Sequence, residues 1–339
     1  PCALVVSVPL SFFSGIGCAS RKGILIKGSG YMEQLAKLGV CVFDKTGTLT
    51  EGQFSLTEVH AQNGDNDTLL SMAAALEENS NHPIARSIVS ACPPERRSAV
   101  SEFTEQPGLG VSGILDGAHI CAGNRALMEH LGIVLSEEES AGTVIHVARE
   151  NEYLGYLVIE DREKDEAKQA LAALHAQGVQ KLVMLTGDRE GAAKAVASRL
   201  GIDEYHASLL PGDKVGYVEG YLGKAGSVAF VGDGINDAPV LSRADVGIAM
   251  GAMGSDAALE AADVVLMQDK LTALPLAVRI SRKTKRIVME NIVAALAVKA
   301  VVLVLGALGV ASMWIAIFAD VGVLILAVLN AMRALTIKD

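Results

Sequence analysis

The sequence has few cysteines, and their positions do not suggest a disulfide framework. The 339 residues include five cysteines, without regular spacing, at positions 2, 18, 41, 92 and 121. Cys41 and Cys121 lie in or beside apolar runs, where cysteine acts as a small core residue. The pattern predicts reduced cytosolic thiols and argues against a disulfide-stapled fold.

The chain also lacks an excess of positive charge. It has 29 Lys and Arg residues against 39 Asp and Glu residues, a formal net charge of −10. A net negative charge argues against nucleic acid as a partner. It suits a site that gathers carboxylates around a divalent cation.

The sequence has no initiator methionine, and its hydrophobic residues are unevenly distributed. It begins with Pro1 inside an apolar segment, residues 2–19, so we expect the second half of a membrane helix here and no signal peptide. Two apolar stretches, 287–308 and 312–332, lie near the other end. Basic residues at their outer ends predict a membrane hairpin with both ends in the cytosol, and their lengths argue against a buried soluble helix pair.

A short apolar run, 40–43, follows the first apolar segment and ends at Asp44. A glycine-containing turn follows, so we expect a buried strand that delivers a carboxylate to the edge where α/β sheets bind ligands. Further apolar runs at 182–185, 228–231 and 246–250 alternate with helical patterns and predict a parallel sheet. Residues 57–158 lie between these strands and predict an inserted α/β or α+β domain.

Polar groups follow two of these predicted strands. Thr186-Gly187-Asp188 could hold phosphoryl oxygens through a hydroxyl and a backbone amide, although this tripeptide is common. The turn 232–239 carries Asp233 and Asp237 on a glycine-rich loop, which suits Mg²⁺. Lys214 could hold the phosphoryl group as a fixed positive charge; taken alone, it also fits a solvated surface lysine.

Asp44-Lys45-Thr46-Gly47-Thr48-Leu49-Thr50 is the phosphorylation signature of P-type ATPases, and the chain resembles this family from end to end. The resemblance implies an α/β fold: a haloacid-dehalogenase-like Rossmann phosphorylation domain with an inserted α+β nucleotide-binding domain, plus transmembrane helices. Asp44 would be the nucleophile, and Mg²⁺ would be held by Asp44, the Thr46 carbonyl and Asp233, with Asp237 and Asn236 close by. The catalytic residues that it implies are Asp44, Lys45, Thr46, Thr186, Gly187, Asp188, Lys214 and Asn236.

The same resemblance divides the chain into five parts. They are the second half of the Cys-Pro-Cys membrane helix (1–23), the first part of the phosphorylation domain (24–56), the nucleotide-binding domain (57–158), the second part of the phosphorylation domain (159–276) and a C-terminal membrane hairpin (277–339).

Position 46 argues against a phosphatase. Related phosphatases of the haloacid-dehalogenase class carry a second Asp two residues after the nucleophile, as general acid and base. Thr46 stands there instead and cannot shuttle protons at neutral pH. We therefore expect a long-lived aspartyl phosphate.

Five residues in the inserted domain match positions that bind ATP in the heavy-metal branch of the family: Glu77, His82, Gly108, Gly110 and Asn124. The marks of this branch are Ser-x-His-Pro at 80–83 and Gly-x-Gly at 108–110. The glycines would let backbone approach the nucleotide, and His82 could contact the adenine. The alternative for His82-Pro83 is a helix entry with proline at the first position.

Two ionisable residues in the apolar helices indicate which kind of ion is transported. Lys299 lies about ten residues before the hairpin turn and Asp320 about ten after it, so both would lie at equal depth, ~15 Å from the turn. Cys2 with Ser7-x-Pro9, Asn291-x7-Lys299 and Asp320-x-Gly322 resemble the zinc/cadmium/lead branch, and the copper motifs are absent. Cys2, Lys299 and Asp320 would form the transported-metal site. A plain interhelical salt bridge is the alternative.

These features predict ATP-driven export of Zn²⁺, Cd²⁺ or Pb²⁺ through an aspartyl phosphate at Asp44. We expect an integral protein of the bacterial plasma (inner) membrane, with cytosolic soluble domains and with ATP, the metal ion, the bilayer and a missing N-terminal part of the pump as partners. We expect the actuator domain to lie outside this chain, so this chain alone should bind nucleotide but not transport. The alternatives are a P-type pump for another transition metal, a membrane-tethered phosphatase and a non-catalytic remnant.

Overall fold

A computed structural model describes residues 2–80, 82–135, 142–224, 226–233, 237–251, 260–309 and 312–337, apart from the side chains of Cys2, Pro83, Pro211 and Ile315. The chain divides into two compact units. The first contains Pro1–Leu49, Asp165–Asp188 and Ala197–Asp339, and the second contains Thr50–Lys164 and Arg189–Val196.

The first unit is built on a seven-stranded sheet with the order β1-β13-β12-β11-β2-β9-β10. Neighbouring strands are parallel except for β1, which is antiparallel to β13. Every residue of β2, β11, β12 and β13 is buried, which explains their continuous apolar runs. The strands are β1 (Ile24–Ile26), β2 (Leu38–Asp44), β9 (Lys181–Leu185), β10 (Glu204–His206), β11 (Ser227–Gly232), β12 (Val246–Met250) and β13 (Val264–Leu266).

Helices connect these strands. Val218 of α8 and Val240 and Leu241 of α9 join valines and leucines of β2, β9 and β11 in one buried cluster. The helices are α2 (Ser29–Ala36), α6 (Ala167–Ala176), α8 (Pro211–Tyr221) and α9 (Ala238–Arg243), with α7 (Glu190–Leu200) divided between the two units.

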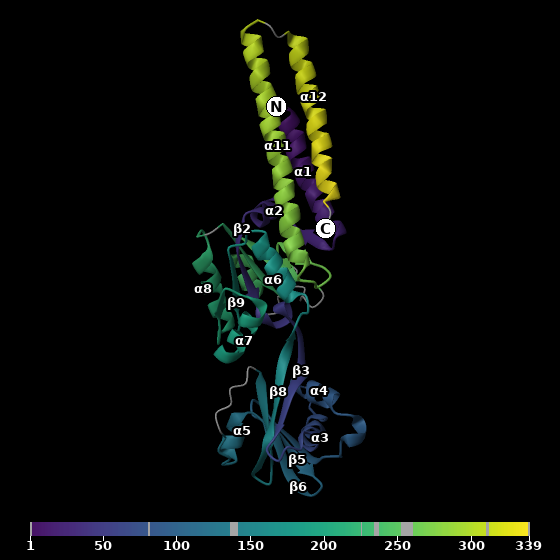
Figure 1. The fold of residues 1–339 in the computed structure, drawn as a ribbon, viewed down its shortest axis with the longest axis vertical. Helices are drawn as coiled ribbons and strands as arrows, with labels where there is room; N and C mark the ends of the chain where they lie inside the picture. Colours follow the sequence, from purple (N-terminus) through teal and green to yellow (C-terminus); the bar gives the residue numbers. More distant parts are fainter. Residues whose placement is uncertain are drawn as a thin grey trace. The chain divides into compact units, whose positions relative to one another are not determined.

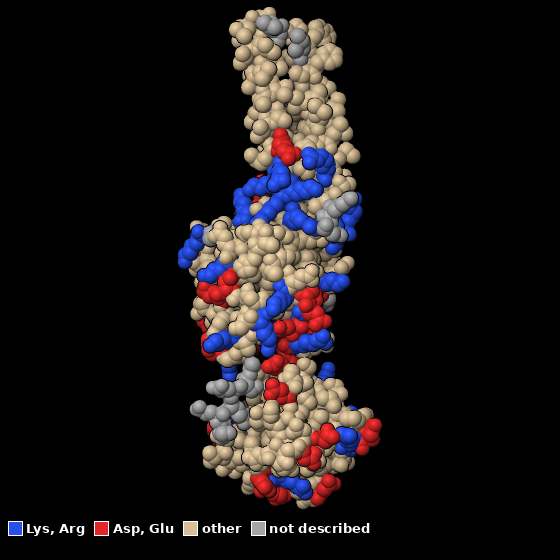
Figure 2. Space-filling model, in the orientation of Figure 1, with Lys and Arg blue, Asp and Glu red and all other residues tan. Residues whose placement is uncertain are grey.

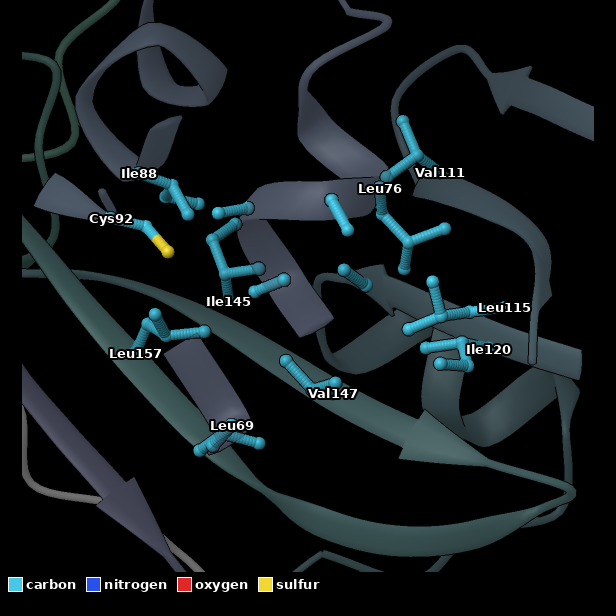
Figure 3. Packing of buried hydrophobic residues seen from close by; sticks show 14 of the residues in the cluster. Leu69, Leu76, Ile88, Cys92, Val111, Leu115, Ile120, Ile145, Val147 and Leu157 are labelled. Carbon is cyan, nitrogen blue, oxygen red and sulfur yellow. The ribbon is translucent and has the colours of Figure 1, made fainter. Parts of the chain in front are cut away.

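The second unit contains an antiparallel six-stranded sheet with the order β3-β8-β7-β6-β5-β4. Its core lies between this sheet and helices α3 and α4, where Leu76 and Ile88 meet Val147 and Leu157 (Figure 3). The elements are β3 (Thr50–Ala61), α3 (Asn66–Glu77), α4 (Pro83–Ala91), a short helix at Pro94–Arg96, β4 (Ser101–Gln106), β5 (Gly110–Leu115), β6 (Ala118–Gly123), α5 (Arg125–His130), β7 (Thr143–Arg149) and β8 (Glu152–Glu163).

Three long apolar helices of the first unit lie side by side: α1 (Cys2–Arg21), α11 (Ala273–Ala307) and α12 (Met313–Met332) (Figure 1). Each is long and apolar enough to cross a membrane. Lys and Arg residues gather at one end of these helices (Figure 2), as expected for the cytosolic side. A short helix, Arg333–Thr336, follows α12.

The predicted α/β class is confirmed, with a parallel sheet, an α+β insertion and three apolar helices. The predicted hairpin helix 287–308 is longer in the structure, because α11 begins at Ala273 and includes the basic segment before it.

Candidate active site and membrane cavity

The carboxyl ends of three adjacent strands bring the predicted chemistry together. Asp44 is the last residue of β2 and is paired in register with Leu185 of β9. On the other side, Val231 of β11 pairs with Phe43. The turns that carry Thr186 and Asp233 therefore begin beside Asp44, which is buried.

Lys214 links two carboxylates of this site. It lies in the first turn of α8, and its Nζ donates to Asp44 Oδ1 at 2.7 Å and to Asp237 Oδ1 at 2.9 Å. The lysine is buried, so the surface alternative for Lys214 is wrong. Asp44, Asp233 and Asp237 each offer an oxygen, and these atoms lie within 4.8 Å of one another.

Lys214 donates to two of the three clustered carboxylates, and this contact shifts the pKa values on both sides. Burial, with the nearby Asp237, raises the pKa of Asp44 to about 7 against the opposing effect of Lys214. Burial lowers the pKa of Lys214, but Asp44 and Asp237 outweigh it and hold that pKa above its ordinary value. A bound cation would favour the ionised carboxylates.

This donor set fits Mg²⁺, which prefers oxygen ligands and uses few protein carboxylates. The turn after β2 is shaped to approach the cluster closely. Gly47 has φ of 71°, and a Cβ atom there would lie 2.7 Å from Asp233 Oδ2. Only glycine tolerates both conditions, so Gly47 lets the Lys45–Leu49 turn pack against Asp233.

The remaining catalytic candidates lie at the same sheet edge. Lys45 forms an ion pair with Asp188, which joins the turn after β2 to the turn after β9. The Thr186 hydroxyl accepts the N–H of Asp188 at 3.1 Å, and Gly187 between them is exposed. Asn236 lies outside the described residues.

Two backbone hydrogen bonds that hold the turn after β9 were not predicted from the sequence. The Thr186 N–H donates to the carbonyl of His206 at 3.0 Å, and the Ser208 N–H donates to the carbonyl of Asp188 at 2.7 Å. Ser208 has φ of 55°, an uncommon value for a residue other than glycine. Strand β10 is only three residues long, Glu204-Tyr205-His206, and has no apolar run, so this edge strand was not predicted.

In the second unit, Asn124 organises the predicted Gly-x-Gly turn. Its Nδ2 donates to the Gly108 carbonyl at 2.7 Å, while its Oδ1 accepts the Leu127 N–H and caps α5. A Cβ atom on Gly110 would lie 2.3 Å from the Ala122 carbonyl oxygen, whereas nothing lies within 4 Å of the corresponding position on Gly108. Strand packing therefore requires Gly110, and Gly108 leaves open space at the turn.

The other two nucleotide candidates differ in their surroundings. Glu77 is buried at the end of α3, and its burial, with the nearby Glu105, raises its pKa to about 7. Glu105 lies on β4 and pairs with Val111, the residue after Gly110. His82 is exposed, and its Nδ1 accepts the Ile84 N–H at 3.3 Å as the N-cap of α4.

Between α1, α11 and α12 lies a cavity of about 370 Å³. Lys299 and Asp320 both line it, together with Ala3 and Ala295. No ion pair joins these two charged residues, both of which the structure describes, so the plain salt bridge is not what holds the helices together. The Cys2 side chain lies outside the description, but Ala3 beside it lines the cavity.

Comparisons with known proteins agree with this arrangement. Residues 38–245 match the family of haloacid dehalogenase-like hydrolases. The cadmium, zinc and cobalt-transporting ATPase of Bacillus subtilis (strain 168) is 49% identical over 100% of this chain and 49% of its own length. The crystal structure of a zinc-transporting PIB-type ATPase in its E2.Pi state superposes with a TM-score of 0.87 at 38% identity, covering 99% of this chain and 56% of that one.

The chain belongs to the heavy-metal P-type ATPases. The zinc-transporting ATPase of Synechocystis sp. (strain ATCC 27184 / PCC 6803 / Kazusa) is 48% identical over 98% of the chain and 47% of its own length. The chain thus spans about half the length of the curated relatives it matches. Membership of this family and the three apolar helices make it an integral membrane protein.

Proposed function

We propose that this chain carries the phosphorylation site, the nucleotide site and part of the cation site of an ATP-driven heavy-metal exporter. The observation that carries the proposal is the buried cluster in which Lys214 bridges Asp44 and Asp237 at the carboxyl edge of the sheet. The relatives named for cadmium, zinc and cobalt suggest these cations as cargo, and Pb²⁺ is a further candidate because soft donors suit it as well.

The first chemical step would be the transfer of the γ-phosphoryl group of ATP to Asp44. A carboxylate oxygen of Asp44 forms the new bond to phosphorus, the bond from phosphorus to the bridging oxygen breaks, and ADP leaves with that oxygen. Lys214 binds Oδ1 of Asp44, so the second oxygen is the one available for attack. Lys214, the Thr186 hydroxyl and the Gly187 amide would hold the phosphoryl oxygens.

Asp44, Asp233, Asp237 and the Thr46 carbonyl would hold Mg²⁺, with Asn236 nearby. When bound, this ion would neutralise charge on the carboxylates and on the incoming phosphate. The chain's own residues keep these carboxylates together, because Lys214 bridges two of them and Gly47 lets the turn approach the third.

The acyl phosphate should outlast a conformational change. Thr46 is exposed and stands where related phosphatases carry an acid and base. With no carboxylate at this position, water attack lacks a local proton acceptor. A lasting intermediate is what a pump requires, and it argues against a membrane-tethered phosphatase.

The cavity between the membrane helices would take the cation. Asp320 supplies a hard oxygen ligand and Cys2 a soft sulfur ligand, a combination that suits Zn²⁺ and Cd²⁺. Lys299 would act as the counter-charge of Asp320 when the metal has left. Both charged residues line the same 370 Å³ cavity.

The nucleotide would bind in residues 57–158, at Glu77, His82, Gly108, Gly110 and Asn124. Residues 24–56 and 159–276 would form the phosphorylation domain, and 1–23 and 277–339 the membrane part. The relatives in Bacillus and Synechocystis favour a bacterial plasma membrane, with the soluble domains cytosolic.

The test is the metal dependence of ATP hydrolysis by the full-length protein. We expect stimulation by Zn²⁺ or Cd²⁺ that Asp320→Ala abolishes and that Ile317→Ala, a substitution of an apolar residue lining the same cavity, preserves. A rate of ATP hydrolysis that none of these metal ions increases would contradict the proposal, and so would broad phosphomonoesterase activity. The same measurements would rank Zn²⁺, Cd²⁺, Pb²⁺ and Co²⁺ by how strongly each stimulates ATP hydrolysis.

A further inference from the structure

Asn291 is a buried amide among the membrane helices that the transport chemistry above does not use. It lies on α11, two turns before Lys299, and is 3% exposed. A polar side chain in the hydrocarbon layer is costly unless each of its groups has a partner. All the polar groups of Asn291 have one.

The amide of Asn291 contacts both neighbouring helices. Its Nδ2 donates to the Ala327 carbonyl of α12 at 3.1 Å and to the Ser11 hydroxyl of α1 at 3.4 Å. Its Oδ1 accepts from Nδ2 of Asn330 of α12 at 2.9 Å. One side chain therefore holds three helices at a single level.

The hydrogen bonds around Asn291 form a chain in which each side chain accepts from one neighbour and donates to the next. Arg333 donates to Asn330 Oδ1 at 2.5 Å, which leaves the Asn330 amide to donate to Asn291. At the far end, the Ser11 hydroxyl donates its own proton to the Ser7 carbonyl at 2.7 Å and accepts from Asn291. This order fixes the orientation of the Asn291 amide, so the contacts cannot be exchanged by flipping it.

The contact at Asn291 also fixes the depth of the two charged residues. In antiparallel helices that rise ~1.5 Å per residue, eight residues from Asn291 to Lys299 cover ~12 Å, and seven from Ala327 back to Asp320 cover ~10.5 Å. The Asn291–Ala327 hydrogen bond therefore places Lys299 and Asp320 within ~1.5 Å of the same level. The cavity that both line agrees with this register.

A slip of α11 against α12 by one helical turn, ~5.4 Å, would separate these groups. The Asn291 amide would lose its acceptors, and Lys299 and Asp320 would move apart in depth. We propose that Asn291 is a positioning residue for the transported-metal site, which holds Lys299 and Asp320 in register through Ser11, Ala327 and Asn330. This inference rests on the proposed function, since it assigns a role toward the proposed cation.

The test compares Asn291→Leu with Ser281→Ala in the full-length protein. Ser281 is a matched control because it is a fully buried polar residue of the same helix whose hydroxyl has no hydrogen-bond partner. We measure ATP hydrolysis against Zn²⁺ concentration, together with nucleotide binding. Asn291→Leu should raise the half-maximal Zn²⁺ concentration at least tenfold with nucleotide binding unchanged, and Ser281→Ala should stay within twofold of the unsubstituted protein.

Asn330→Ala provides a second route, because Asn330 is only half-buried and the variant removes one partner of the same amide. It should raise the half-maximal Zn²⁺ concentration in the same direction, even if Asn291→Leu fails to fold. A lowered maximal rate with an unchanged half-maximal Zn²⁺ concentration in these variants would overturn the positioning role. If the unsubstituted protein shows no metal stimulation, the proposed function itself fails instead.

Discussion

The contact between Lys214 and Asp44 yields the most quantitative prediction about catalysis. Lys214→Met keeps the length of the side chain but removes its charge and both hydrogen bonds, to Asp44 at 2.7 Å and to Asp237 at 2.9 Å. Asp44 and Asp237 then lose the ammonium group that they share. Since Lys214 is what lowers the pKa of Asp44, that pKa should rise above its value of about 7.

The magnitude follows from the type of contact. A hydrogen bond to a charged group contributes ~1.5–3 kcal/mol, so the two bonds together are worth ~3–6 kcal/mol. If the activation free energy of phosphoryl transfer rises by only the lower figure of ~3 kcal/mol, phosphorylation slows at least ~100-fold, because ~1.4 kcal/mol corresponds to a tenfold change in rate. A larger share of protonated Asp44 at neutral pH adds to the loss, because the neutral acid is a poor nucleophile.

The assay is the rate of acid-stable phosphate incorporation from γ-labelled ATP into the full-length protein, measured beside nucleotide binding. Lys181→Met is the matched control, since Lys181 forms a half-exposed ion pair with Glu204 away from Asp44. That change should cost less than threefold, because exposed ion pairs are worth ~0–1 kcal/mol. Phosphorylation of Lys214→Met within threefold of the unsubstituted protein, at equal nucleotide binding, would refute the reasoning.

Three further predictions concern other parts of the chain. The pKa of Glu77 is raised to about 7 in the folded state, so the unfolded state ionises first and stability should fall as pH rises from ~4.5 to ~7, by up to ~3 kcal/mol at ~1.4 kcal/mol per unit. Urea unfolding at pH 5 and pH 8 should show this difference, and Glu77→Gln should remove it; an equal slope in both proteins would contradict the assignment. Gly110→Ala should destabilise the second unit by at least ~2 kcal/mol, since its Cβ would lie 2.3 Å from a carbonyl oxygen, whereas Gly108→Ala, in open space, should cost ~1–2 kcal/mol from its backbone conformation alone. Equal midpoints in thermal unfolding would argue against the packing account. Thr46→Asp should shorten the lifetime of the phosphorylated protein ~100-fold in a chase with unlabelled ATP, because it supplies a general base; an unchanged lifetime would mean that position 46 does not control hydrolysis.

The strands that carry the site could be predicted because their signals are local. Apolar runs that end at Asp44 or just before Asp233 mark buried strands, and parallel strands bring their carboxyl ends to one edge. Counting residues on either side of the hairpin turn predicted that Lys299 and Asp320 lie close together, and both line one cavity. In each case a period or a spacing along the chain determined the answer.

Other features depend on contacts between distant residues and could not be predicted in this way. The burial of Lys214 follows from the packing of α8, and its bond to Asp44 joins residues 170 positions apart. Strand β10 is only three residues long, Glu204-Tyr205-His206, and is recognisable only from its pairing with β9. Asn124 was predicted as a nucleotide ligand from the resemblance alone, and its two hydrogen bonds, one to the Gly108 turn and one that caps α5, are visible only in the structure.

The proposed pump mechanism depends most directly on Asp44 as the residue that receives phosphate. The decisive measurement is the site of label after incubation of the full-length protein with γ-labelled ATP, Mg²⁺ and Zn²⁺, followed by acid quench and peptide mapping. The account predicts a single acid-stable, hydroxylamine-sensitive label on the peptide that contains Asp44, absent in Asp44→Asn. Label that persists in Asp44→Asn, or its absence from a protein that binds nucleotide and hydrolyses ATP, would contradict it.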